Sequence, residues 1–311
     1  MKKAIWRLAT LFFIVLLAYA IGRLYFRFTA GFTEDNIASD FSFQSQWVVR
    51  PLCSVEQEEV AQALNQPYAY LGKGCQSYVF ASRDGKYVIK FFKHQRYRLK
   101  PWLLYCPPLP AIVKYRQEKL EQKWRKFDAF AQSWKIAFEH LRDETGLVFV
   151  HLNQTDDLER PLILYDKMGY RHAIALDGLT FCLQRRATLL CDTLLQYKAR
   201  GDLAGAQQLV RLLLDMILTE YARGLADNDH ALMQNTGVAE GRPVHIDVGQ
   251  FAINENVKQP AVFHQEFFTK TYKFNQWLRS HYPELSDYLE KELQSLIGPD
   301  YSSMRPNPPK R

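Results

Sequence analysis

Residues 72–90 constrain the fold of this chain more than any other stretch, and they read GKGCQSYVFASRDGKYVIK. Residues 78–80 and 87–89 are rich in the aromatic and β-branched side chains that favour strands. Between them, the sequence RDGK at 83–86 supplies hairpin-turn chemistry. Upstream, two glycines and a serine leave backbone amides accessible to an anion. The stretch therefore predicts three strands joined by a glycine turn and a hairpin, with Lys90 ending the last strand.

The length of 311 residues allows one large two-lobed domain or two modest domains. The net charge of +7 favours anionic partners such as nucleotides, phosphates or a membrane surface. The basic residues are scattered and no nucleic-acid-binding motif accompanies them, so we expect no nucleic-acid partner.

The cysteines favour free thiols in a reducing compartment. They form no CxxC pair, and no His/Cys cluster has the spacing of zinc ligands. An odd, scattered set does not resemble a disulfide framework. The five cysteines are Cys53, Cys75, Cys106, Cys182 and Cys191.

An uncharged apolar run at residues 8–22 lies near the N-terminus. It is flanked by Lys2, Lys3 and Arg7 before it and by Arg23 and Arg27 after it. A signal peptide would combine such a basic start with small residues at its cleavage point, which the sequence AYA at 18–20 supplies. The alternative is a membrane anchor over residues 4–25, close to the ~20 residues that span a bilayer. We prefer the anchor because arginine and tyrosine follow the run, as at a membrane interface.

Two features of the sequence predict opposite orientations of the chain across the membrane. The basic residues before the run weakly place the N-terminus in the cytoplasm and the main domain outside. Free thiols and a phosphate-binding type of turn argue for the main domain in the cytoplasm instead.

The remaining pattern predicts an α+β fold. A short helix with Ser54 as N-cap is expected over residues 54–65, and a loop over 91–110. Residues 111–142 contain no glycine or proline and carry apolar residues at helical spacing, which predicts a long amphipathic helix. The same reasoning predicts strands at 146–153, 161–166 and 244–246, and helices at 179–200, 203–223 (with Asp202 as N-cap), 261–281 and 284–297.

These elements suggest a β-rich lobe followed by a mostly helical lobe. The expected segments are an anchor or signal segment at 1–28, a lead-in at 29–67, a first lobe at 68–168, a second lobe at 169–297 and a flexible tail at 298–311.

Acidic and amide side chains gather after the helix expected to end at residue 223. Asp227, Asp229 and Asn235 are expected on a loop between that helix and a strand, and Asp247 follows the strand. A carboxylate that accepts a hydroxyl proton, with Asn and Asp oxygens that hold Mg²⁺, is what phosphoryl transfer requires.

Together these motifs resemble the protein kinase-like superfamily over about residues 68–251. GKGCQSYVF resembles the glycine-rich loop, VIK the third-strand lysine, and DNDHALMQN stands where the catalytic loop belongs. The string HIDVG resembles the metal-binding motif, especially that of phosphatidylinositol kinases. The resemblance implies a two-lobed kinase-like fold with ATP and Mg²⁺ as cofactors.

The resemblance also implies roles for individual residues. Lys90 would bind the nucleotide phosphates and take part in catalysis, and Asn235 and Asp247 would hold Mg²⁺. The catalytic base would be Asp229 or Asp227; we prefer Asp229, although the family spacing falls on His230. Five further residues would contact the nucleotide: Gly72, Lys73, Gly74, Ser77 and Val79. The long helix offers three candidate partners for the lysine: Glu118, Glu121 and Glu139.

The acceptor of the phosphate is unknown. Residues 248–268 contain no Ser, Thr or Tyr, so an activation loop ordered by phosphorylation is not expected. This favours a lipid, small-molecule or unusual protein acceptor for a membrane-anchored phosphotransferase. Two alternatives remain: an inactive pseudokinase that serves as a binding module, and an exported protein without nucleotide chemistry.

Overall fold

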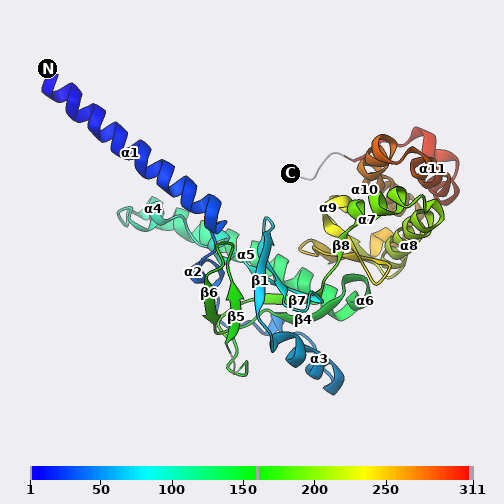
Figure 1. Ribbon diagram of the computed structural model, residues 1–311, viewed down its shortest axis with the longest axis horizontal. Coiled ribbons are helices and arrows are strands. Elements are labelled where there is room, and N and C mark those ends of the chain that lie inside the picture. Colours follow the sequence, from blue (N-terminus) through cyan, green and yellow to red (C-terminus); the bar gives the residue numbers. More distant parts are fainter. Residues whose placement is uncertain (1, 159–160, 308–311) are drawn as a thin grey trace. The chain divides into compact units, whose positions relative to one another are not determined.

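The computed structural model describes residues 2–158 and 161–307 as an α+β protein (Figure 1). Its residues form two compact units, which are described separately below. Unit 1 comprises Met1–Phe43, Cys53–Leu120 and His151–Leu183, and unit 2 comprises Gln44–Leu52, Glu121–Val150 and Gln184–Arg311.

A β-sheet forms the centre of unit 1. The expected meander is present: β1 (Tyr68–Lys73), β2 (Ser77–Ser82) and β3 (Tyr87–Phe92) pair antiparallel in sequence order. Beyond β1 lie β5 (Leu162–Tyr165), parallel to it, and β6 (Arg171–Ile174). Alternate side chains of β2 and β3, among them Tyr78, Phe80 and Ile89, are buried on one face, because strand side chains point to opposite faces in turn.

One prediction fails in this region. We expected a helix over residues 179–200, but β7 (Phe181–Arg185) and β8 (Thr188–Leu189) come first, and helix α7 (Leu190–Ala199) begins only at Leu190. Residues 181–184 are all buried, so β7 lacks the polar alternation of a half-exposed strand. The short apolar run of Phe181, Cys182 and Leu183 is equally compatible with a buried helix.

Short elements complete unit 1. The helix expected at 54–65 is α3 (Ser54–Leu64), but its N-cap is Cys53, whose backbone N–H donates to Glu56 at 2.9 Å. The expected loop at 91–110 holds the 3-10 helix η2 (His94–Arg96) and the one-turn helix α4 (Pro101–Leu104). Another one-turn helix, α2 (Glu34–Ile37), follows the N-terminal helix.

The N-terminal helix α1 (Lys2–Thr29) is exposed from residue 5 to residue 28, and its last residue, Thr29, is buried. Its segment Ile5–Thr29 has a mean hydropathy of 2.0 and is long and apolar enough to cross a membrane, a test that signal sequences also pass. After it, Ala30 and Gly31 adopt positive φ angles of 58° and 76°. The Gly31 carbonyl accepts hydrogen bonds from Tyr78 and from Asn36, the latter at 2.8 Å.

Helices build the core of unit 2. The expected helix at 203–223 is α8 (Leu203–Ala222), and its N-cap Asp202 accepts a hydrogen bond from the Gly205 N–H at 2.8 Å. Its buried face packs with those of α10 (Pro260–His281) and α11 (Pro283–Ile297) in one apolar cluster. The expected long helix is α5 (Pro110–His140); its second half, in unit 2, buries Phe127, Phe130, Ala131, Ser133, Trp134, Ala137 and Phe138.

Short strands in unit 2 carry the acidic segment. The strand expected at 244–246 is β11 (Arg242–His245), and it forms a hairpin with β10 (Thr236–Ala239), which was not predicted. A second pair joins β9 (Leu225–Asp227) to β12 (Phe251–Ile253). The remaining elements are η1 (Ser45–Trp47), α6 (Arg142–Thr145), β4 (Leu147–His151), α9 (Leu232–Asn235), η3 (Glu255–Lys258) and η4 (Pro299–Ser303).

Candidate active site

In unit 1, strand register brings three of the predicted nucleotide-binding residues into one row. Gly72 of β1 lies opposite Val79 of β2, which lies opposite Lys90 of β3. Paired residues of adjacent strands share a face, and adjacent strands are ~4.8 Å apart. The row therefore places an open backbone, an apolar side chain and an amine side by side, on the face opposite Tyr78 and Phe80.

The glycine turn beside this row has room for a ligand. The Gly74 N–H donates a hydrogen bond to the Ser77 carbonyl at 3.0 Å, and this bond closes a tight turn between β1 and β2. Neither Gly72 nor Gly74 has a positive φ. A Cβ added at Gly72 would meet nothing within 4 Å, and one at Gly74 only the Ser77 hydroxyl at 3.8 Å. The register of β1 shifts between Tyr70 and Gly72, an irregularity at which glycine is common, and the absence of side chains also leaves the backbone open to close approach of a ligand.

Lys73 does not join the row. It pairs with Tyr78, so its side chain belongs to the other face of the sheet. There its ammonium donates to the Ala30 carbonyl at 2.8 Å and lies 3.9 Å from the ring centroid of Phe26. Its side chain is therefore left out of the nucleotide site proposed below.

A second amine, Lys93, supports the glycine turn. Its ammonium donates to the Gly74 carbonyl at 2.6 Å and lies 4.4 Å from the Tyr78 ring centroid. Burial, together with the positive charges of Lys73 and Arg96, lowers the pKa of Lys93 to about 8. The turn thus rests on a crowded group of cations, an environment that favours an anion nearby.

The lowered pKa of Lys93 predicts how stability depends on pH. Between about pH 8 and the ordinary lysine pKa of 10.5, the unfolded chain holds a proton that the folded chain has released. The contribution of Lys93 to the free energy of unfolding therefore rises with pH in this window. We expect Lys93→Met to lose this rise, so that its stability relative to the parent chain falls from pH 8 to pH 10. Denaturant unfolding at each pH measures the difference, and an unchanged difference across the window would contradict the prediction.

In unit 2, the β10–β11 hairpin brings together the two predicted magnesium ligands. Thr236 pairs with His245 at the open end of the hairpin, and the Ile246 N–H donates to the Asn235 carbonyl at 2.7 Å. Asn235 and Asp247 therefore leave the two strands from the same end. Asp247 also accepts a hydrogen bond from the Gly249 N–H at 3.2 Å, which orients its carboxylate.

Asparagine and aspartate side chains carry the type of oxygen that magnesium prefers. Mg²⁺ is commonly held by one or two protein oxygens together with nucleotide phosphates and water. Within residues 2–158 and 161–307, no group of three or more His, Cys, Asp or Glu residues could hold a metal by itself. A metal at Asn235 and Asp247 would therefore depend on the phosphates for its remaining ligands.

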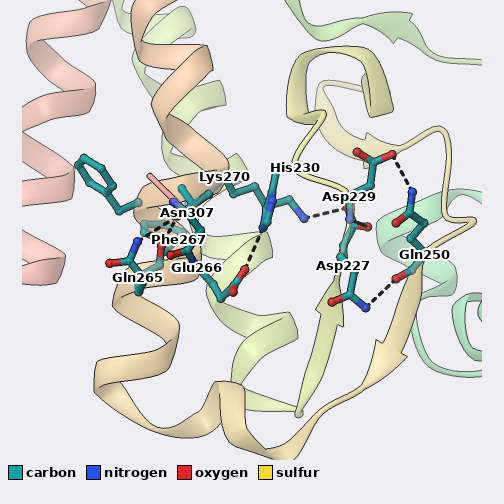
Figure 2. A network of polar contacts seen from close by, with 12 residues as sticks. Asp227, Asp229, His230, Gln250, Gln265, Glu266, Phe267, Lys270 and Asn307 are labelled. Atoms are coloured by element: carbon teal, nitrogen blue, oxygen red, sulfur yellow. Dashed lines mark hydrogen bonds and ion pairs between the residues drawn. The ribbon is translucent and has the colours of Figure 1, made fainter. Parts of the chain in front are cut away.

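The two candidate bases have different environments. Asp227, the last residue of β9 rather than a loop residue, is buried, and its carboxylate accepts from Lys270 at 2.9 Å (Figure 2). Asp229 is only partly buried and accepts from the Ala231 N–H at 3.0 Å and from Gln250 at 3.4 Å. The geometry thus leaves Asp229 closer to solvent and commits Asp227 to an ion pair.

Lys270 was not singled out from the sequence, yet it is central to this network (Figure 2). Its side chain is 1% exposed and that of Asp227 2%. Burial by itself lowers the pKa of Lys270, but the charge of Asp227 outweighs burial and holds the pKa above its usual value. His230, which lies five residues before Asn235, is paired with Glu266 at 2.9 Å.

A second buried pair supports the strand that leads to Asp247. His245 of β11 and Glu220 of α8 lie 2.6 Å apart and are at most 1% exposed. The Gln184 side-chain amide donates to the His245 carbonyl at 2.8 Å. Just beyond Asp247, the Ser133 hydroxyl accepts from the Phe251 N–H at 2.6 Å. A charged residue on the apolar face of a helix, such as Glu220 or Lys270, was the available sequence signal for these contacts.

No family model and no curated protein matches the chain. Among solved structures, the chain is similar to one of WbdD, a bifunctional kinase-methyltransferase. That structure is 16% identical with a TM-score of 0.37, covering 79% of this chain and 49% of that chain. A complex of Rv3197 with erythromycin from Mycobacterium tuberculosis is 14% identical with a TM-score of 0.33, covering 78% of this chain and 60% of that chain. The ADP-bound aminoglycoside phosphotransferase APH(2'')-Ib is 12% identical with a TM-score of 0.21, covering 80% of this chain and 91% of that chain.

The chain spans about half the length of the WbdD structure that it matches.

Proposed function

We propose that this chain is a phosphotransferase of the protein kinase-like type that uses ATP and Mg²⁺. The observation that carries the proposal is the row of Gly72, Val79 and Lys90 across three antiparallel strands, beside a glycine turn with open space at the Gly72 Cβ position. In kinases a glycine-rich loop covers the nucleotide phosphates and a lysine on the third strand binds them. The same two features, a glycine turn and a lysine on the third strand, occur here in the same chain order.

Each candidate residue has a defined task in this proposal. Lys90 binds the nucleotide phosphates, backbone amides from Gly72 to Ser77 cover them, and Val79 gives an apolar contact. Asn235 and Asp247 hold Mg²⁺, which when bound neutralises charge on the phosphate oxygens. Asp229 accepts the proton of the attacking hydroxyl, because its carboxylate is not committed to a buried ion pair.

Asp227 acts as a positioning residue in this scheme. Its carboxylate accepts from the Asp229 N–H at 3.0 Å as well as from Lys270. It therefore holds the backbone that carries the proposed base. The apolar helix α1 serves as the membrane anchor, supported by its length, its hydropathy and the exposure of its apolar segment.

One observation favours a second candidate function. The position five residues before Asn235 holds His230, whose ring is paired with Glu266. A histidine engaged in this way leaves the usual base position without a carboxylate. A kinase-like module that binds nucleotide without transferring phosphate is the resulting alternative.

Nucleotide binding provides the test of the proposal. A ligand that binds only the folded state at about 100 times its Kd stabilises it by about 2.7 kcal/mol. We therefore expect Mg-ATP to raise the unfolding temperature of the full chain in detergent micelles. Lys90→Met should lose this increase, whereas Lys86→Met, at an exposed position in the adjacent hairpin, should retain it. Absence of any Mg-ATP effect on the unmodified chain would refute both the enzyme and the binding module.

A further inference from the structure

A basic pocket lies where helix α1 meets the sheet of unit 1. The cavity measures about 500 Å³ and is lined by Arg23, Leu24, Phe26, Arg27, Ala30, Tyr70, Lys73 and Lys167. Four of these eight residues are cationic and none is acidic. The pocket includes Lys73 and so belongs to the face of β1 opposite the row that ends at Lys90.

The junction fixes this pocket relative to the helix. The Lys167 ammonium donates to the Arg27 carbonyl at 2.9 Å, and Lys73 donates to that of Ala30 at 2.8 Å. Lysines suit these positions because the last carbonyls of a helix lack partners and carry partial negative charge. A Cβ at Gly31 would lie 2.5 Å from the Phe26 ring, so the chain passes very close to the helix here. The pocket is therefore built by the fold rather than by a loose linker.

The position along α1 indicates the depth of the pocket in a membrane. Arg23 follows the uncharged residues 8–22, and Arg27 lies one helical turn later on the same side. Arginines and aromatic residues at the end of an apolar helix sit at the level of the lipid headgroups. Leu24 and Phe26 line the pocket and also belong to the exposed apolar helix.

We propose that this pocket binds the phosphate of an anionic phospholipid whose acyl chains lie along α1. The four cations bind the phosphate, and Leu24 and Phe26 contact the first part of the acyl chains. A soluble phosphate has no acyl chains and would not make these apolar contacts. Basic pockets beside membrane helices bind anionic headgroups for the same electrostatic reason. The inference rests on α1 being the membrane anchor, and it is independent of nucleotide chemistry.

Lipid binding to the full chain in detergent micelles tests this assignment. Native mass spectrometry would compare phosphatidylglycerol, phosphatidylcholine with the same acyl chains, and glycerol 3-phosphate as the soluble headgroup. We expect phosphatidylglycerol to bind at least about tenfold more tightly than either, since each basic residue near the surface contributes roughly fivefold. Equal binding of the two lipids, or equal binding of glycerol 3-phosphate, would overturn the lipid assignment.

Variants locate the site. Arg23→Gln should weaken phosphatidylglycerol binding roughly fivefold, and Arg23→Gln with Lys167→Gln roughly thirtyfold, from the same contribution per charge. Arg171→Gln, an exposed arginine of β6 outside the pocket, is the matched control and should leave binding unchanged. Equal losses in the control and the pocket variants would mean a general charge effect and would reject the pocket.

Flotation with neutral phosphatidylcholine vesicles separates the premise from the inference. A chain that fails to float with neutral vesicles lacks the anchor, and the lipid site falls with it. A chain that floats but shows no lipid preference retains the anchor and lacks the site. Neither result changes the Mg-ATP test above.

Discussion

Replacing Lys270 by methionine is expected to destabilise unit 2 by about 3–5 kcal/mol, the cost of breaking a buried ion pair from one side. The Asp227 side chain is 2% exposed, so without Lys270 its charge would stay buried and unpaired. Methionine nearly preserves the volume of lysine, so lost packing contributes little. Denaturant unfolding of the full chain in micelles, followed by tryptophan fluorescence, measures the loss.

An exposed ion pair in the same unit provides the matched control. Lys258 and Glu255 lie 2.6 Å apart, but their side chains are 43% and 67% exposed. Pairs of this kind contribute about 0–1 kcal/mol, so Lys258→Met should have little effect. A loss at Lys270 no larger than that at Lys258 would contradict the role of the buried pair.

The double variant Lys270→Met with Asp227→Leu separates the ion pair from the fold. Replacing both partners of a buried pair by apolar residues is often neutral, because no charge is left unpaired. We therefore expect the double variant to recover much of the stability lost by the single one. Such recovery would place the cost in the unpaired charge of Asp227.

The sequence predicted the local parts of the candidate site well. The meander from β1 to β3 depends on neighbouring residues: β-favouring runs, a glycine turn and the sequence RDGK. The register that aligns Gly72, Val79 and Lys90 follows from these two turns. Helix α8 and its cap at Asp202 were also predictable, because a cap lies within one turn of the helix that it starts.

Parts that depend on distant residues escaped prediction. Residues 181–184 of β7 are all buried, so its pattern could not be distinguished from that of a buried helix. Strand β9 is only 3 residues long and exists through its pairing with β12, more than twenty residues later. The partner of Asp227 is 43 residues away on α10. Sequence order gave no means of choosing Lys270 among the other lysines, since the ion pair is defined by tertiary packing.

The different environments of Asp227 and Asp229 lead to the second large prediction. Replacing a general base typically lowers the rate about 10²–10⁴-fold. We expect Asp229→Asn to lower the kcat of Mg-ATP turnover by this amount while leaving the Mg-ATP stabilisation and the unfolding temperature close to those of the parent chain. Because the acceptor is unknown, release of phosphate from ATP to water is the first measurement.

Asp227→Asn should show the opposite division of effects. Its main consequence is a lower unfolding temperature, because Lys270 would lose its buried partner. At temperatures where this variant stays folded, its kcat should fall less than that of Asp229→Asn, since Asp227 acts only through the backbone of Asp229. Reversed effects, with Asp227→Asn folded and inactive and Asp229→Asn active, would assign the base to Asp227.

Turnover by the unmodified chain decides between the two proposed functions. A chain that is stabilised by Mg-ATP and transfers no phosphate to water or to any acceptor tested would be the binding module favoured by His230. The variant His230→Asp then gives a direct physical test, because it restores a carboxylate five residues before Asn235 and removes the pairing with Glu266. Turnover that appears only in His230→Asp would show that the missing carboxylate, and not the nucleotide side of the site, had prevented catalysis.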